Sequence, residues 1–151
     1  MKGLLLMLTA LTGAAALYAA PAGSSDLVTE RYYARETWSS FADLGPANPG
    51  RRGPADVVVS RLRLTTPDGV KAGLAHGYAV GLRRPYVFSH WTAFLATGTL
   101  TLEGVSADSP AAGPQDLTIV GGSGEYRDAH GTVTASDAGT RGTLVVLRYA
   151  R

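Results

Sequence analysis

Segments in which apolar and polar, or large and small, side chains alternate follow one another along most of the chain. The clearest is 73–82, where glycine or alanine stands at every odd position and a larger residue at every even one. Successive side chains of a strand point to opposite faces, so this pattern predicts a strand with one small and one large face. Similar segments rich in β-branched and aromatic residues are separated by Gly, Pro and Asp, as is typical of antiparallel strands. The pattern predicts eight strands, over residues 27–41, 56–65, 71–82, 86–95, 97–105, 116–120, 131–136 and 142–150.

Eight short strands without a long helical segment predict a single all-β domain, either a barrel or a sandwich. Periodicity does not distinguish these two folds. The chain has no cysteine, so no disulfide can stabilise it, and strand pairing together with the core must do so. A closed barrel leaves no sheet edge exposed, which suits such a chain.

The N-terminus has the order of a secretory signal. Lys2 is followed by a small and apolar run to about Ala20, and then by the small residues of Ala20-Pro21-Ala22. This order predicts a signal peptide over 1–22, a mature domain over 23–151 and a secreted protein. The alternative is a membrane anchor, which needs roughly 20 predominantly apolar residues. The run is marginal in length and rich in Ala and Gly towards its end, which favours cleavage.

Charge and composition limit the classes of molecule that we expect the protein to bind. The chain has 14 Lys and Arg against 12 Asp and Glu, so we expect no nucleic acid partner and no anionic membrane partner after cleavage. The lack of cysteine excludes thiolate nucleophiles and thiolate metal ligands. We expect no cofactor.

The most specific segment is a glycine-rich stretch that follows the strand at 116–120. Its glycines permit backbone angles closed to other residues, and Tyr126 can plug one end of the core. A phosphate-binding loop is the competing interpretation, but that loop ends in Gly-Lys-Ser/Thr and precedes a long helix. Only six residues separate Gly124 from Gly131, so nucleotide binding is not expected.

This stretch resembles the Gly-Gly-Thr/Ser-Gly-x-Tyr/Phe-Arg-x-Ala-Arg-Gly signature of plant dirigent proteins and allene oxide cyclase barrel-like proteins, small exported bacterial members among them. His130 stands at the position of the second arginine. The resemblance implies an eight-stranded antiparallel β-barrel of calycin type, assembled as a homodimer or homotrimer, which holds a reactive small molecule in one conformation. The matching residues, expected to form a structural turn, are Gly121, Gly122, Gly124, Tyr126, Arg127 and Gly131.

Candidate ligand-binding residues come from the large face of segment 71–82 and the neighbouring strand. His76, Tyr78 and His90 are polar groups on apolar strand faces, the usual composition of a small-molecule site; the alternative is that they are ordinary residues near a barrel mouth. Acid–base chemistry would need a carboxylate, imidazole or similar group at the cavity, and the candidates are Glu36, Arg61 and His90. Two histidines without a third ligand do not make a metal site.

Three hypotheses of function follow. The first is an exported barrel that binds a small apolar or phenolic molecule unchanged. The second is a cyclase, isomerase or stereochemical guide that orders a reactive substrate in the same cavity. The third is a structural domain with a filled core. An interior cavity on the order of 300 Å³ would contradict the third hypothesis.

Overall fold

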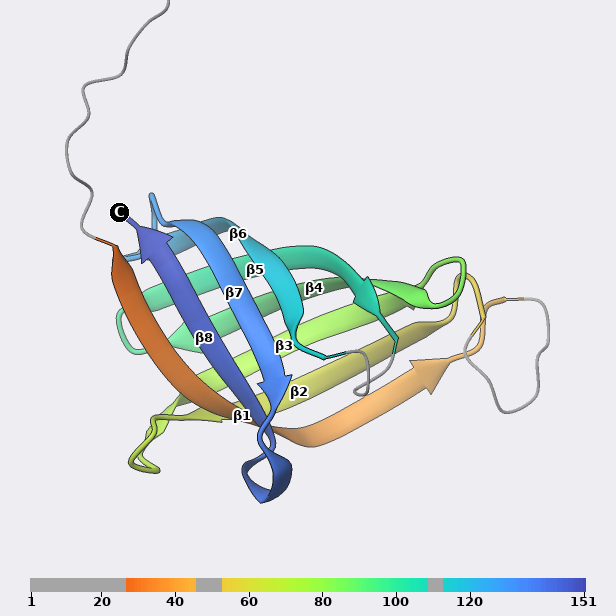
Figure 1. Ribbon diagram of the computed structural model, residues 1–151, viewed down its shortest axis with the longest axis horizontal. Helices are drawn as coiled ribbons and strands as arrows, with labels where there is room; N and C mark the ends of the chain where they lie inside the picture. Colours follow the sequence, from red (N-terminus) through yellow and green to blue (C-terminus); the bar gives the residue numbers. More distant parts are fainter. Residues whose placement is uncertain (1–26, 46–52, 109–112) are drawn as a thin grey trace, which may run out of the picture.

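The computed structural model describes residues 27–45, 53–108 and 113–151, which form a closed antiparallel barrel of eight strands (Figure 1). The predicted eight-stranded all-β barrel is therefore confirmed. The predicted signal peptide lies outside the described residues. The strands are β1 (Val28–Ala42), β2 (Val57–Thr65), β3 (Lys71–Gly81), β4 (Tyr86–Leu95), β5 (Gly98–Ala107), β6 (Gln115–Gly124), β7 (His130–Asp137) and β8 (Thr143–Ala150).

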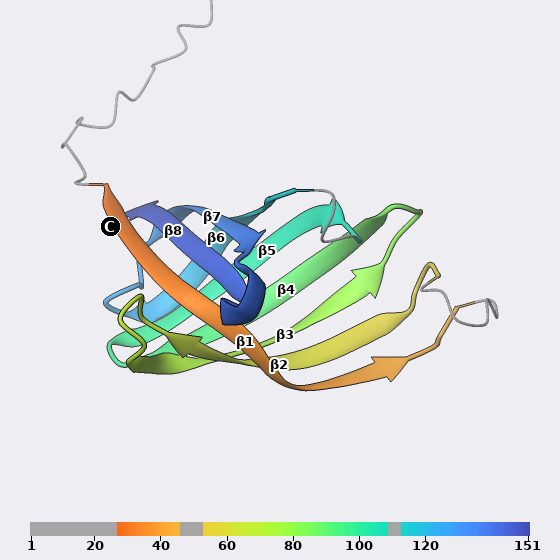
Figure 2. The ribbon, with the colours of Figure 1, turned by 60° about the horizontal axis from the view of Figure 1, so that its bottom comes forward.

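Each strand pairs with the next, and β1 closes the barrel by pairing with β8. β1 is the longest strand and changes partners along its length. The part Val28–Ala34 pairs with β8, and the part Tyr33–Ala42 pairs with β2, with a register shift between Glu36 and Trp38. Figure 2 shows β1 leaving β8 next to the 3₁₀ turn η2 (Gly139–Arg141) and continuing along β2. This end of the barrel is open, and we call it the mouth.

The opposite end is closed by side chains. Leu100, Val133 and Tyr149 are completely or almost completely buried there, and Tyr126 packs against Tyr149 with ring centroids 5.9 Å apart. The prediction that Tyr126 plugs one end of the core is confirmed. Glu30 lies among the tyrosines and accepts hydrogen bonds from the Tyr149 hydroxyl at 2.7 Å and from the Tyr126 hydroxyl at 3.4 Å. At this end the tyrosine hydroxyls therefore have a hydrogen-bond partner, and buried side chains fill the interior.

The glycine-rich segment differs from its prediction in one respect. We expected the strand to end at Val120, but β6 continues to Gly124 and pairs with β5 as far as Gly98. Glycine is needed for this close pairing, because a Cβ on Gly122 would lie 2.3 Å from the carbonyl oxygen of Tyr126. The chain turns only after Gly124, whose φ of +61° favours glycine. The segment thus positions Tyr126 under the closed end.

The strand β3 presents its small face to the interior. Ala75 and Ala79 line the cavity, whereas His76 and Tyr78 point outward. His76 and Tyr78, two of the candidate ligand-binding residues, therefore do not line the cavity. The physical reason is that side chains from the neighbouring strands occupy the space above β3, as described below.

Within the described ranges, the structure contains no helix long and apolar enough to cross a membrane.

Candidate functional site

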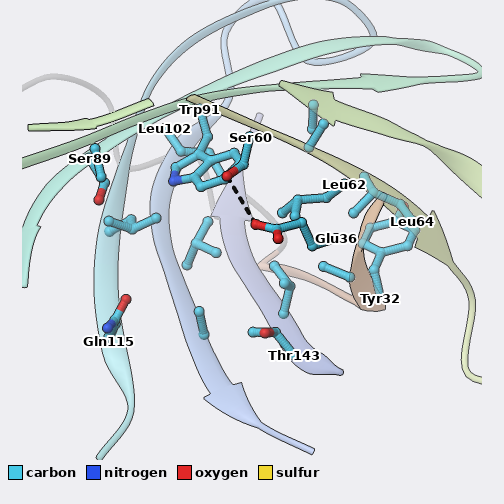
Figure 3. A pocket seen from close by; sticks show the side chains of 18 of the residues that line it. Tyr32, Glu36, Ser60, Leu62, Leu64, Ser89, Trp91, Leu102, Gln115 and Thr143 are labelled. Carbon is cyan, nitrogen blue, oxygen red and sulfur yellow. Dashed lines mark hydrogen bonds between the residues drawn. The ribbon is translucent and has the colours of Figure 1, made fainter. Parts of the chain in front are cut away.

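A cavity of about 570 Å³ extends from the mouth into the barrel. This volume lies within the range of small-molecule sites and contradicts the hypothesis of a filled core. Its deep part is apolar and its polar groups gather towards the mouth (Figure 3). The side chains that define the site are Tyr32, Glu36, Ser60, Leu62, Leu64, Ala75, Ala79, Ser89, Trp91, Ala93, Leu102, Gln115, Leu117, Val133 and Leu147.

The indole of Trp91 forms a flat wall of the cavity because Gly77 makes room for it. Gly77 pairs with Trp91 on β4 and with Ser60 on β2, so the three residues form one row across the sheet. A Cβ on Gly77 would lie 2.3 Å from both Cδ2 and Cε3 of the indole. The ring therefore lies directly over the glycine backbone and extends across β3 towards Ser60 and Glu36, as Figure 3 shows.

Glu36 is the carboxylate of the site. It faces the cavity from β1, just before the strand's register shift, and is exposed to solvent at the mouth. Its Oε2 accepts a hydrogen bond from the buried Ser60 hydroxyl at 3.0 Å, and its Oε1 accepts one from the Ser39 hydroxyl at 3.0 Å. Two hydroxyl donors hold the carboxylate in place and leave its charge uncompensated. Within the described part of the chain, Glu36 has no ion pair.

Two further polar side chains face Glu36 from other strands. Ser89 on β4 is only 7% exposed, and it lines the cavity. Gln115 at the start of β6 lines the cavity, and its Nε2 donates to the carbonyl oxygen of Ala107 at 3.2 Å. Both side chains can form hydrogen bonds with a ligand in this cavity.

The deep end of the cavity offers no free polar group of this kind. Tyr32 lies there, and its hydroxyl donates to Oε2 of Glu30 at 2.6 Å. Burial, followed by the hydrogen bond to Glu30, raises the pKa of Tyr32 well above its ordinary value. The phenol therefore stays protonated and committed to Glu30, and the deep part of the cavity accommodates an apolar group.

A buried carboxylate organises the loop beside the mouth. Asp56, just before β2, accepts hydrogen bonds from the backbone N–H groups of Leu44 at 3.2 Å, of Gly45 at 3.1 Å, and of Gly53. These backbone donors hold the pKa of Asp56 below its usual range, Gly53 having the largest effect. Asp56 thus ties the end of β1 to the start of β2.

Of the predicted acid–base residues, only Glu36 reaches the cavity. Arg61 is exposed on the outer face of β2, opposite Trp38 and His76 in the strand register. His90 is on the outer face of β4, where its Nδ1 lies 2.8 Å from Oε1 of Glu103. The structure therefore does not bring the three candidates together.

The predicted ligand-binding residues form a cluster on the outside of the barrel. Tyr78 stacks on His90 with ring centroids 5.2 Å apart, and His76 meets Phe94 edge-on at 5.5 Å. None of the three lines the cavity, so a ligand-binding role for His76, Tyr78 and His90 stays a prediction. In the described segments, no three His, Asp or Glu side chains lie close enough together to hold a metal ion.

The sequence contained a signal for the residues that we did not predict. Alternation along a strand puts Ser89 and Trp91 on one face and His90 on the other, but nothing in that alternation indicates which face is inside. Ser60 and Gln115 carry no motif. The register Ser60–Gly77–Trp91 would have identified the inner face, because a large ring opposite a glycine points to close packing over the backbone.

The arrangement can bind a small molecule and orient it. Apolar walls would desolvate one part of the ligand, the indole of Trp91 would contact a flat surface, and Glu36 with Ser89 would fix the polar part. A carboxylate beside a bound molecule can also accept a proton during a reaction. Orientation alone lowers a barrier by roughly 7–11 kcal/mol in favourable cases, so a cavity of this kind needs few reactive groups.

No protein-family model matches the sequence, and no curated protein does. Solved structures do. A pyocyanin demethylase shares 22% identity with a TM-score of 0.71, over 82% of this chain and all (100%) of that one. The exo-specific intermolecular Diels-Alderase AbnU shares 12% identity with a TM-score of 0.63, over 82% of this chain and 96% of that one. The pterocarpan synthase dirigent protein GePTS1 shares 18% identity with a TM-score of 0.64, over 82% of this chain and 87% of that one. The chain therefore has the barrel fold that occurs in dirigent proteins and in cyclases.

Proposed function

We propose that the protein is an exported barrel that binds one small, largely apolar molecule, phenolic or otherwise aromatic, in its interior. The observation that carries this proposal is the open cavity of about 570 Å³, with apolar walls and a few polar groups near the mouth. A core selected for stability alone would be packed closely, with few voids larger than a water molecule. The interior of this barrel instead contains an open volume far larger than that.

Saturable binding of a neutral probe tests the proposal. N-phenyl-1-naphthylamine is aromatic and uncharged, and its emission rises in apolar surroundings. We expect one molecule to bind per chain. Ala79→Phe should abolish binding, because Ala79 lines the cavity. Val59→Phe is the matched control, since Val59 is 43% exposed on the outer face of the neighbouring strand. Binding that is absent in the wild type, or equal in both variants, would contradict an interior site.

A second candidate function is guidance of a reaction, as in the cyclases and the dirigent protein that share the fold. The specific observation that favours it is Glu36, a carboxylate held by two hydroxyls at the edge of the cavity. To test it, phenol radicals generated with a one-electron oxidant are allowed to couple in the presence of the protein. An enantiomeric excess that falls in Glu36→Gln supports guidance, and a racemic product with the wild type argues against it for this substrate class.

The resemblance to small exported members of the allene oxide cyclase barrel-like group supports the export signal and an assembly of two or three copies. The outer face of the barrel is apolar enough for such an assembly. It exposes Val59, Tyr78, Phe94 and Val105 on β2 to β5. Sedimentation equilibrium of the mature chain measures the number of copies directly.

A further inference from the structure

The mouth of the cavity places an aromatic face next to an uncompensated negative charge. Trp91 lies over Gly77, and the same row of the sheet continues to Ser60, whose hydroxyl donates to Glu36 at 3.0 Å. The face of an indole carries the negative part of the ring's quadrupole and attracts cations. A carboxylate attracts them as well, so both groups select the same kind of ligand.

Among the residues that the structure describes, no basic side chain forms an ion pair with Glu36. Arg35 is the basic residue that lines the cavity, and its Nη2 donates to the backbone carbonyl of Thr140 in the turn η2. Glu36 accepts only from Ser39 and Ser60 within the described residues. A hydroxyl donor orients a carboxylate without cancelling its charge. A cation that enters the mouth therefore finds a carboxylate already in position.

We propose that the cavity selects a flat aromatic cation, such as a protonated or N-alkylated nitrogen heterocycle, whose ring lies against Trp91 and whose positive charge lies next to Glu36. This inference rests on the proposed function, because it specifies the ligand class of the same cavity. The apolar deep part of the cavity receives the uncharged portion of the molecule. Ser89 can donate a hydrogen bond to a polar group of the molecule nearer the mouth. Anionic aromatic molecules are disfavoured by repulsion from Glu36.

Three two-ring probes of nearly equal shape separate charge from size: N-methylquinolinium, 1-methylnaphthalene and 1-naphthoate. Their binding is followed by saturable quenching of Trp91 in a Trp38→Phe background, which leaves Trp91 as the only tryptophan. We expect the cation to bind about tenfold more tightly than the anion. This lies between the effect of an exposed ion pair and that of a buried one.

Substitution of Glu36 assigns the preference to one group. Glu36→Gln should weaken the binding of N-methylquinolinium about tenfold and leave the binding of 1-methylnaphthalene unchanged. Unchanged binding of the neutral probe also shows that the variant is folded. Glu103→Gln removes the same charge from the outer face, where Glu103 contacts His90, and should alter neither probe.

The outcomes are distinct. If the cation binds no more tightly than the anion, or if Glu36→Gln weakens the neutral probe as much as the cation, the cation preference is overturned while the small-molecule site stands. If none of the three probes binds saturably, the cation site is overturned and the proposed function loses its support as well.

Discussion

Replacement of Gly77 by alanine tests whether the indole of Trp91 forms the cavity wall as described. The added Cβ would lie 2.3 Å from the indole and 2.5 Å from the carbonyl oxygen of His90. Both separations are far below normal contact, so either the ring or the two strands must move. Overpacking of this kind costs about 1–3 kcal/mol, and alanine in a strand recovers about 0.5–1 kcal/mol relative to glycine. The expected net loss of unfolding free energy is therefore about 0–2.5 kcal/mol, and about 1–3 kcal/mol relative to a glycine-to-alanine change that meets no neighbour.

The assay is urea denaturation in the Trp38→Phe background, with Trp91 emission as a second readout. Gly121→Ala is the matched control, because a Cβ on Gly121 meets nothing within 4 Å. It should be neutral or slightly stabilising. In a Trp91→Leu background, the cost of Gly77→Ala should fall, and only the part due to the His90 carbonyl should remain. If Gly77→Ala is as stable as Gly121→Ala and leaves the emission of Trp91 unchanged, the packing argument is refuted.

The remaining predictions concern two buried polar groups and the pH dependence of stability. Backbone N–H groups lower the pKa of Asp56. The stability that its carboxylate contributes is therefore present above the ordinary pKa of an aspartate and is lost as the pH falls through the pKa of the folded state. The stability difference between the wild type and Asp56→Asn should shrink on acidification, and a difference that is constant with pH would contradict this. Burial, followed by the hydrogen bond to Glu30, raises the pKa of Tyr149 from 10.0 to about 12. Its contribution is therefore complete below pH 10 and is lost as the pH rises towards about 12. Tyr149→Phe should show a smaller loss of stability over that alkaline range than the wild type, and equal losses would rule out this role for the phenol.

Local sequence patterns predicted the strands well because a strand repeats every two residues, and that period survives in the sequence. The segment 73–81 shows this clearly, because it is a continuous part of β3 and its residues pair in unbroken order with β4. The two-residue period does not show which face of a strand points to the interior of the barrel. Large residues usually indicate the buried face, but here glycine and alanine face inward because the indole of Trp91 covers β3 from the adjacent strand.

The candidate site was predicted in part for the same reason. Glu36 lies on the inner face because it pairs with Leu62, which lines the cavity. Arg61 and His90 were selected for their chemistry, and each is one residue away from an inner position. A shift of one residue along a strand moves a side chain to the other face. Only the register between strands, set by long-range pairing, decides which of these groups shares the cavity.

The most direct test of the interior site is native mass spectrometry of the chain recovered from its natural source. We expect the mass of a mature chain that begins after Ala22 with one small molecule bound non-covalently. Activation in the gas phase should release this molecule. Ala79→Phe, produced in the same source, should carry none. A wild-type chain that shows only its bare mass, or an adduct retained equally by Ala79→Phe, would contradict the claim that the barrel interior is a ligand site.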